Sequence, residues 1–219
     1  DGCITGEKEM VASMESLSEA LIRGDRNKVA ELTTAALSEG AAPQDVLEKG
    51  LIAGMMVVGK RFKANEVYVP EVLIAARAMH AGLNILQPAL TKAGVEPVGV
   101  VVLGTVKGDL HDIGKNLVGM MLTGGGLKVV DIGIDASADK FVEACKNSNA
   151  QVCAMSALLT TTMPQMAEVV KALKAANLDV KIIIGGAPVT QNFANEIGAD
   201  GYAADAASAV DVVQTLIKN

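Results

Sequence analysis

Apolar residues recur at spacings of three and four through the first part of the chain, from residue 7 to residue 92. Such spacing places them on one face of a helix, and the interruptions in the pattern predict four helices. Gly24 ends the first helix, and Asp25 is placed to cap the second. Pro43 suits the first turn of the third helix, and Pro70 opens the fourth. Four helices with short connections indicate a compact bundle over residues 7–92.

The pattern changes after a polar stretch, residues 93–97, which we interpret as a linker. Apolar runs rich in β-branched residues predict strands at Val98–Leu103, Leu127–Ile132, Gln151–Met155, Val180–Ile184 and Gly201–Ala204. The segments between and after them predict helices at Lys115–Leu122, Ala138–Lys146, Met163–Ala176, Val189–Ile197 and Ala206–Ile217. Strict alternation predicts an α/β fold over residues 98–219, with a five-stranded, doubly wound parallel sheet of the flavodoxin-like (Rossmann-like) type. Residues 1–6 are expected to form a flexible tail.

Composition narrows the possible functions. The 219 residues carry a formal net charge of −6, which argues against nucleic acid because its phosphates attract basic surfaces. No apolar run approaches the roughly 18 residues of a membrane span. The cysteines, Cys3, Cys145 and Cys153, share no metal-type spacing, and the first residues lack a signal-peptide pattern. We therefore expect a cytoplasmic protein, with residues 145 and 153 serving as small buried apolar side chains.

The most distinctive stretch is polar and lies between a predicted strand and a predicted helix. It runs from Gly104 to Asn116 and contains two aspartates, one histidine and three glycines. Ligands of open α/β sheets bind at the carboxyl ends of the strands, where this stretch begins. Ser156 and the pair Gly185-Gly186 follow other predicted strands, and Ala206 follows the last. These residues therefore converge on one edge of the sheet, where we expect the site.

His111 stands two residues after Asp109 in this stretch. A histidine that ligates a metal through one ring nitrogen commonly has the other nitrogen held by a carboxylate. One imidazole cannot hold a metal alone, so the remaining ligands would come from outside the protein, as from a macrocycle. The other histidine, His80, lies on the polar face of the fourth predicted helix, where a ligand role is not expected.

Three spaced elements, Asp109-x-His111-x-x-Gly114, Ser156-x-Leu158 and Gly185-Gly186, resemble the cobalamin-binding module. The helical region carries its own match. Gly54-Met55, Val58-Gly59, Phe62 and Tyr68-Val69-Pro70 are similar to the helical cap of methionine synthase and of the corrinoid proteins of anaerobic methyltransferase systems. The resemblance covers nearly the whole chain after its first residues.

The resemblance implies that cobalamin binds with its own base displaced and that His111 becomes the lower axial ligand of cobalt. It implies a relay from His111 through Asp109 to Thr162. It also implies that Phe62 and Val69 cover the upper face of the corrin and that residues after the third and fourth strands line a channel for the nucleotide tail. The implied cofactor contacts are Phe62, Val69, Gly108, Asp109, Leu110, His111, Asp112, Ile113, Gly114, Ser156, Leu158, Thr160, Thr162, Gly185, Gly186 and Ala206.

The function implied by this resemblance is that of a methyl carrier without catalysis of its own, using cob(I)alamin and methylcobalamin. A substrate-specific methyltransferase would load it from methanol, a methylamine, a betaine or a methoxylated aromatic. A second methyltransferase, acting on tetrahydrofolate or coenzyme M, would unload it, and a reductive activator would restore the corrinoid. The alternatives are a cobalamin subunit of a carbon-skeleton isomerase, a cobalamin-responsive regulator and a flavin-binding protein of the same fold.

Several of these residues also have simpler interpretations. His111 alone would be a solvated loop histidine, and Gly185-Gly186 a tight turn. Ser156 would be a helix cap, and Phe62 a core residue of the bundle. Asp112 either caps the following helix or contacts the corrin through its backbone, and the sequence leaves this open.

Overall fold

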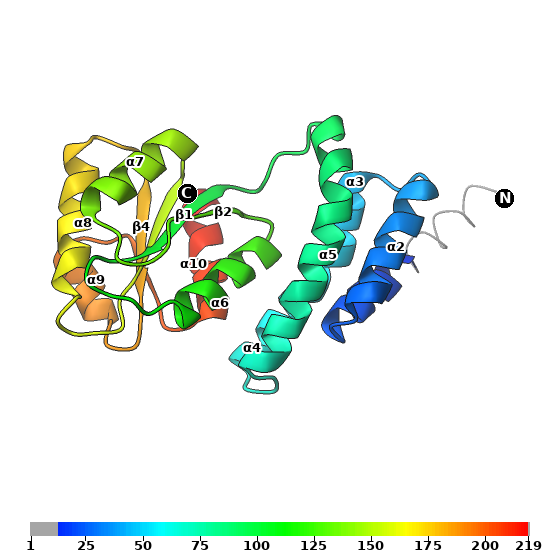
Figure 1. The fold of residues 1–219 in the computed structure, drawn as a ribbon, viewed down its shortest axis with the longest axis horizontal. Helices are drawn as coiled ribbons and strands as arrows, with labels where there is room; N and C mark the ends of the chain where they lie inside the picture. The colour runs from blue at the N-terminus through cyan, green and yellow to red at the C-terminus, as the bar shows by residue number, and fades with distance from the viewer. Residues whose placement is uncertain (1–12, 219) are drawn as a thin grey trace. The chain divides into compact units, whose positions relative to one another are not determined.

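The computed structural model describes residues 13–218, which fold as two compact units (Figure 1). The first ends at Glu96 and also includes Gly124–Gly126, while the second comprises Pro97–Thr123 and the chain from Leu127 onward. The expected tail, residues 1–6, and Cys3 lie outside the described residues. No helix within residues 13–218 is long and apolar enough to cross a membrane.

The regular elements of the first unit, within its described residues, are all helices. Its elements are a helix that includes residues 13–22, α2 (Arg26–Ser38), α3 (Pro43–Asp45), the π-helix η1 (Val46–Ile52), α4 (Ala53–Lys63) and α5 (Val69–Ala93). Asp25 caps α2 as predicted, because its side chain accepts a 2.9 Å hydrogen bond from the backbone N–H of Lys28. His80 is exposed on α5, in agreement with its predicted polar face.

The third predicted helix is continuous in the chain but not uniform, and the expectation of a single α-helix was wrong in its middle. Seven residues, Val46–Ile52, adopt the wider π form between α3 and α4. This turn buries Gly50, where an added Cβ would lie 2.5 Å from the Leu17 side chain. Apolar periodicity does not distinguish one helical hydrogen-bond register from another, so the sequence pattern could not reveal the π turn.

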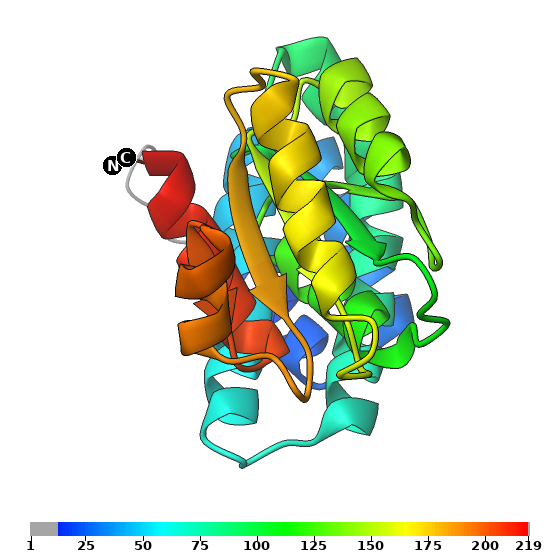
Figure 2. The same cartoon turned by 90° about the vertical axis from the view of Figure 1, so that its left-hand side faces the viewer.

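The second unit alternates strands and helices as the sequence predicts. Its elements are β1 (Val100–Thr105), α6 (Ile113–Gly124), β2 (Lys128–Asp131), α7 (Ala138–Ser148), β3 (Val152–Ser156), α8 (Pro164–Ala175), β4 (Lys181–Gly185), α9 (Gln191–Ile197), β5 (Gly201–Ala203) and α10 (Ala206–Lys218). The five strands pair in parallel in the order β2-β1-β3-β4-β5. This order confirms the doubly wound sheet. Figure 2 shows α8, in yellow, running beside β4, in amber.

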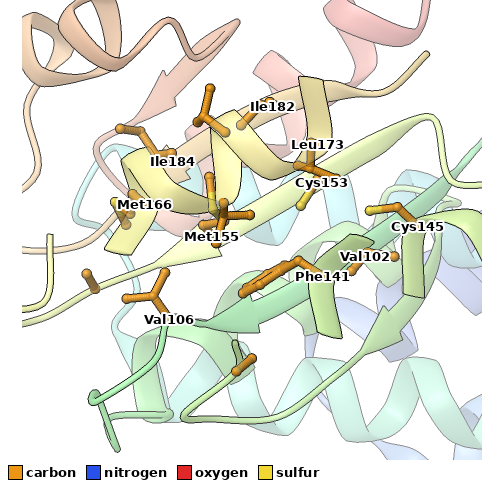
Figure 3. Packing of buried hydrophobic residues seen from close by; sticks show 14 of the residues in the cluster. Val102, Val106, Phe141, Cys145, Cys153, Met155, Met166, Leu173, Ile182 and Ile184 are labelled. Atoms are coloured by element: carbon orange, nitrogen blue, oxygen red, sulfur yellow. The ribbon is translucent and has the colours of Figure 1, made fainter. Parts of the chain in front are cut away.

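One face of the sheet packs against α7 and α8 in an apolar core (Figure 3). Phe141 of α7 is fully buried there, and an added Cβ on Gly104 would lie 2.9 Å from its ring. Gly104 therefore lets the ring approach the strand that leads to the site. Cys145 and Cys153 are free thiols buried in this core, which confirms their interpretation as small apolar residues.

Candidate functional site

The carboxyl ends of four strands form one row at the edge of the sheet. Thr105 of β1 pairs with Ser156 of β3, Ser156 with Gly185 of β4, and Gly185 with Ala203 of β5. The expected convergence of these strand ends is therefore present. Ser156 lies in this row and does not cap a helix, because α8 begins eight residues later, at Pro164.

His111 stands in the loop between β1 and α6 and is held by Asp109. Its Nδ1 lies 2.6 Å from Asp109 Oδ1, and its backbone N–H donates to the same oxygen at 3.1 Å. The His111 side chain is half exposed, whereas that of Asp109 is fully buried. A carboxylate can only accept hydrogen bonds, so the proton of a neutral His111 lies on Nδ1 and the lone pair on Nε2. The ring is thus arranged to offer Nε2 to a metal.

The second oxygen of Asp109 binds the segment that follows β3. Its Oδ2 accepts from the backbone N–H groups of Leu158, at 2.8 Å, and Leu159, at 3.3 Å. The hydroxyl oxygen of Thr162 lies 2.9 Å from the same Oδ2 and also 2.9 Å from the carbonyl oxygen of Leu159. Its single proton can serve either acceptor. The expected chain from His111 through Asp109 to Thr162 is therefore complete in its contacts.

Two opposing effects act on the pKa of Asp109. Burial penalises the charged form and raises the pKa, but hydrogen bonds from Leu158, His111 and Thr162 favour the charged form. The hydrogen bonds dominate and hold the pKa of this carboxyl well below its usual range. Asp109 is therefore ionised at neutral pH and keeps a negative charge beside Nδ1 of His111.

Thr105 is a site residue that the sequence analysis missed. It is fully buried, and its hydroxyl donates a 2.9 Å hydrogen bond to the backbone carbonyl of His111. A hydroxyl at the end of an apolar strand was the available signal. Its partner, six residues away, could not be identified without the fold. Thr105 and Asp109 together hold His111 by its backbone and by its ring.

The glycine pair after β4 brings two backbones into close contact. Gly186 has a φ of 134°, and an added Cβ would lie 1.9 Å from the carbonyl oxygen of Ala157. A Cβ on Gly185 would lie 3.0 Å from the carbonyl oxygen of Ala203. Only glycine fits at position 186, so this edge of the sheet presents bare backbone that a ligand can approach closely.

Apolar side chains are exposed around His111. Leu110 is 69% exposed and Ile113 is 78% exposed, on either side of the imidazole in the chain. Leu158 and Leu159, which bind Asp109 through their N–H groups, are also exposed. Large apolar residues concentrated around one polar group indicate a surface that a ligand covers. Together with Nε2 of His111 and the bare glycine backbone, they fit a large, mostly apolar ring that carries a metal.

Five other predicted contacts of this unit lie near the starts of helices or in turns. Asp112 precedes α6, and its carboxylate accepts from the Asn116 side chain at 3.1 Å. Gly114 lies in the first turn of α6, Thr160 is exposed after β3, and Ala206 opens α10. Gly108 lies in the turn after β1 and has a φ of 80°. Their contacts with a cofactor stay predictions.

The two predicted cap residues belong to the helical unit. Phe62 lies in the last turn of α4, and Val69 opens α5; both are partly buried. Their role over the cofactor stays a prediction. Within residues 13–218, no group of three or more His, Cys, Asp or Glu side chains is placed to hold a metal ion.

Comparisons with known proteins identify two family matches and several relatives. The profile of the B12 binding domain matches residues 99–211, and a second B12 binding domain profile matches residues 14–87. A corrinoid protein of Desulfitobacterium hafniense is 42% identical, covering 95% of this chain and 99% of its own length. Trimethylamine corrinoid protein 2 of Methanosarcina mazei is 40% identical, covering 98% of this chain and 99% of its own.

Two solved structures are similar in fold. The first is from the methanol:cobalamin methyltransferase complex of Methanosarcina barkeri, with a TM-score of 0.85, 29% identity, and coverage of 95% of this chain and 80% of that chain. The second is a cobalamin-binding protein of D. hafniense, with a TM-score of 0.77, 33% identity, and coverage of 93% and 98%.

Proposed function

The chain belongs to the B12-binding family of corrinoid proteins, and we propose that it is the methyl-carrying subunit of a corrinoid-dependent methyltransferase system. The observation that carries this proposal is the similarity to corrinoid proteins over nearly the full length of both chains. The match over residues 14–87 supports a methyl carrier over an isomerase subunit, because the resemblance of this region is to the cap of methyl-transferring proteins. A net charge of −6 speaks against a DNA-binding regulator.

The residues at the sheet edge suit a bound cobalamin. When bound, it supplies a cobalt centre that accepts and releases methyl groups. Nε2 of His111 would hold the cobalt, with the tautomer of the ring fixed by Asp109, whose Oδ1 lies 2.6 Å from Nδ1. Exposed Leu110 and Ile113 would lie against the apolar ring, and the backbone at Gly186 would face the nucleotide tail.

His111, Asp109 and Thr162 also provide a place for a proton. An imidazole that leaves a metal can take up a proton at Nε2, which gives it a positive charge. The ionised carboxylate of Asp109 stabilises that charge through Nδ1, and Thr162 supports the carboxylate from its other oxygen. With this arrangement, His111 would offer Nε2 to a metal while the charge of Asp109 stays beside Nδ1.

We propose an N-methylated amine as the methyl source, supplied by a separate substrate-specific methyltransferase. The relatives named for trimethylamine and dimethylamine are 38–42% identical to this chain, whereas the structure from the methanol system is 29% identical. A second methyltransferase, acting on tetrahydrofolate or coenzyme M, would remove the methyl group, and a reductive activator would return the corrinoid to its reactive state.

The test uses the purified chain reconstituted with hydroxocobalamin. We expect the absorption spectrum of a histidine-ligated cobalamin, and we expect H111A to lose it. H80A is the matched control, since His80 is exposed on α5 and is the only other histidine of the sequence. Transfer from trimethylamine, dimethylamine and methanol is then assayed with cognate methyltransferases. A colourless wild-type chain, or an H111A spectrum identical to wild type, would overturn the proposal.

A further inference from the structure

The segment between β2 and α7 is joined to the loop that carries His111. The backbone N–H of Thr105 donates to the carbonyl oxygen of Gly133 at 2.9 Å, and that of Ala136 donates to the carbonyl oxygen of Thr105 at 3.0 Å. Val106 and Ala136 form an isolated parallel bridge. These contacts extend the pairing of β1 beyond its last ladder with β2, up to the residues that precede Asp109.

Asp135 makes the last two contacts in this series. Its Oδ1 accepts a hydrogen bond from the backbone N–H of Gly108 at 2.7 Å. Its own backbone N–H donates to the carbonyl oxygen of Asp109 at 3.0 Å. Asp135 therefore binds two consecutive residues, Gly108 through its side chain and Asp109 through its backbone. Asp109 in turn binds the ring of His111.

The backbone conformation of Asp135 is unusual for a residue with a side chain. Its φ is 49°, in the left-handed region, where aspartate, asparagine and glycine are tolerated better than other residues. Gly108, which it binds, also has a positive φ, of 80°. The hydrogen bond between Gly108 and Asp135 therefore joins two residues that both have a positive φ, a conformation that few residue types adopt.

We propose that Asp135 is a positioning residue for the axial histidine. By fixing Gly108 and the backbone of Asp109, it holds the carboxylate at the place from which His111 is oriented. This inference rests on the proposed ligand role of His111. Asp135 lies outside the three spaced elements of the sequence, 27 residues from Gly108 in the chain.

The test compares substitutions that separate the hydrogen bond from the backbone conformation. D135G removes the acceptor but suits the positive φ, whereas D135N keeps both an acceptor oxygen and a tolerated φ. N177G is the control, because Asn177 has a φ of 50° and lies in the exposed turn after α8. The measurements are the hydroxocobalamin dissociation constant, the pH at which the histidine-ligated spectrum is half lost, and the Tm of the apoprotein.

For D135G we expect about tenfold weaker hydroxocobalamin binding, as is typical for the loss of a residue that supports a metal ligand. The pH at which the histidine-ligated spectrum is half lost should rise, because protons displace the metal more easily from a less constrained imidazole. D135N and N177G should stay within about twofold of wild type. Should D135G show a lowered apoprotein Tm, the hydroxocobalamin dissociation constants of D135G and wild type are compared at a temperature well below both Tm values, where both proteins are folded.

Two outcomes would overturn the inference. One is a D135G protein that binds and titrates like wild type, and the other is a D135N protein as impaired as D135G. Either result counts against the role of Asp135 provided that wild type shows the histidine-ligated spectrum. A wild-type chain without that spectrum would instead contradict the ligand role of His111, so the two failures are distinguishable.

Discussion

The two units of this chain make their important contacts in different ways. In the helical unit, the contacts that decide packing are apolar and involve small residues, such as Gly50 against Leu17. In the α/β unit, the site depends on hydrogen bonds between segments far apart in sequence, such as Asp109 with Leu158 and Thr162, 49 and 53 residues away. Packing of flexible side chains can adjust to a substitution, whereas a buried carboxylate with fixed donors cannot. The difference predicts unequal sensitivity to substitution.

The largest effect is expected for G186A. Its new Cβ would overlap the carbonyl oxygen of Ala157, and alanine does not favour a φ of 134°. We expect the apoprotein to lose on the order of 3–5 kcal/mol of unfolding free energy, measured by urea denaturation. G40A is the control in the helical unit, since Gly40 has a φ of 88° but no atom within 4 Å of an added Cβ. Similar losses of unfolding free energy in both variants would show that the positive φ causes the loss, and not the contact with the carbonyl oxygen of Ala157.

The next effect is expected for D109A, which leaves the N–H groups of Leu158 and Leu159 without their acceptor. The loss of two acceptors for these partly buried N–H groups should lower the unfolding free energy of the apoprotein by about 2–4 kcal/mol. D45A removes a carboxylate from the helical unit, where Asp45 forms an exposed ion pair with Lys49 at 2.9 Å. This control should change stability little, because exposed ion pairs contribute little. Equal losses in the two variants would contradict the comparison.

The acid sensitivity of the apoprotein should follow from the same carboxylate. The pKa of folded Asp109 is depressed below that of the unfolded chain, about 3.9, so its contribution is fully present above that value. As pH falls below it, the unfolded state takes up the proton first, and stability is lost by up to about 1.4 kcal/mol per pH unit. Urea denaturation between pH 3 and pH 7 should show a shallower loss in D109N than in wild type. Parallel pH profiles would argue against this.

The smallest effect is expected for G50A in the π-helix. The new Cβ would meet the end of the Leu17 side chain, which can move, and alanine favours helix more than glycine does. The net loss of unfolding free energy should be about 1 kcal/mol. The spectrum of bound cobalamin should not change, because no contact at His111 is altered. A changed spectrum in G50A would show that the helical unit influences the axial ligand.

The order of strands and helices followed from local patterns, because alternating apolar runs and amphipathic segments are visible in the sequence. Boundaries were less well predicted. The first strand was expected at Val98–Leu103 and lies at Val100–Thr105, because Gly104 and Thr105 are buried by tertiary contacts that composition does not reveal.

The site residues also fall into those that the sequence identified and those that only the fold revealed. Asp109 and His111 were identified because they stand close together in a polar loop, and Thr162 came only from the family resemblance. Thr105 was missed although it lies within the stretch from Gly104 to Asn116, and Asp135 was missed because its partners lie 26 and 27 residues away. Neither residue type is unusual at its position in the sequence. Only the folded arrangement gives these side chains a specific partner.

The ionised state of Asp109 has an electronic consequence. A permanent negative charge 2.6 Å from the imidazole increases the electron density that the ring passes to any metal bound on its far side. If His111 holds a metal as proposed, adding an electron to that metal would be harder, so the reduction potential would depend partly on a side chain that never touches it. Release of the histidine would remove this donation, and reduction would become easier at that moment.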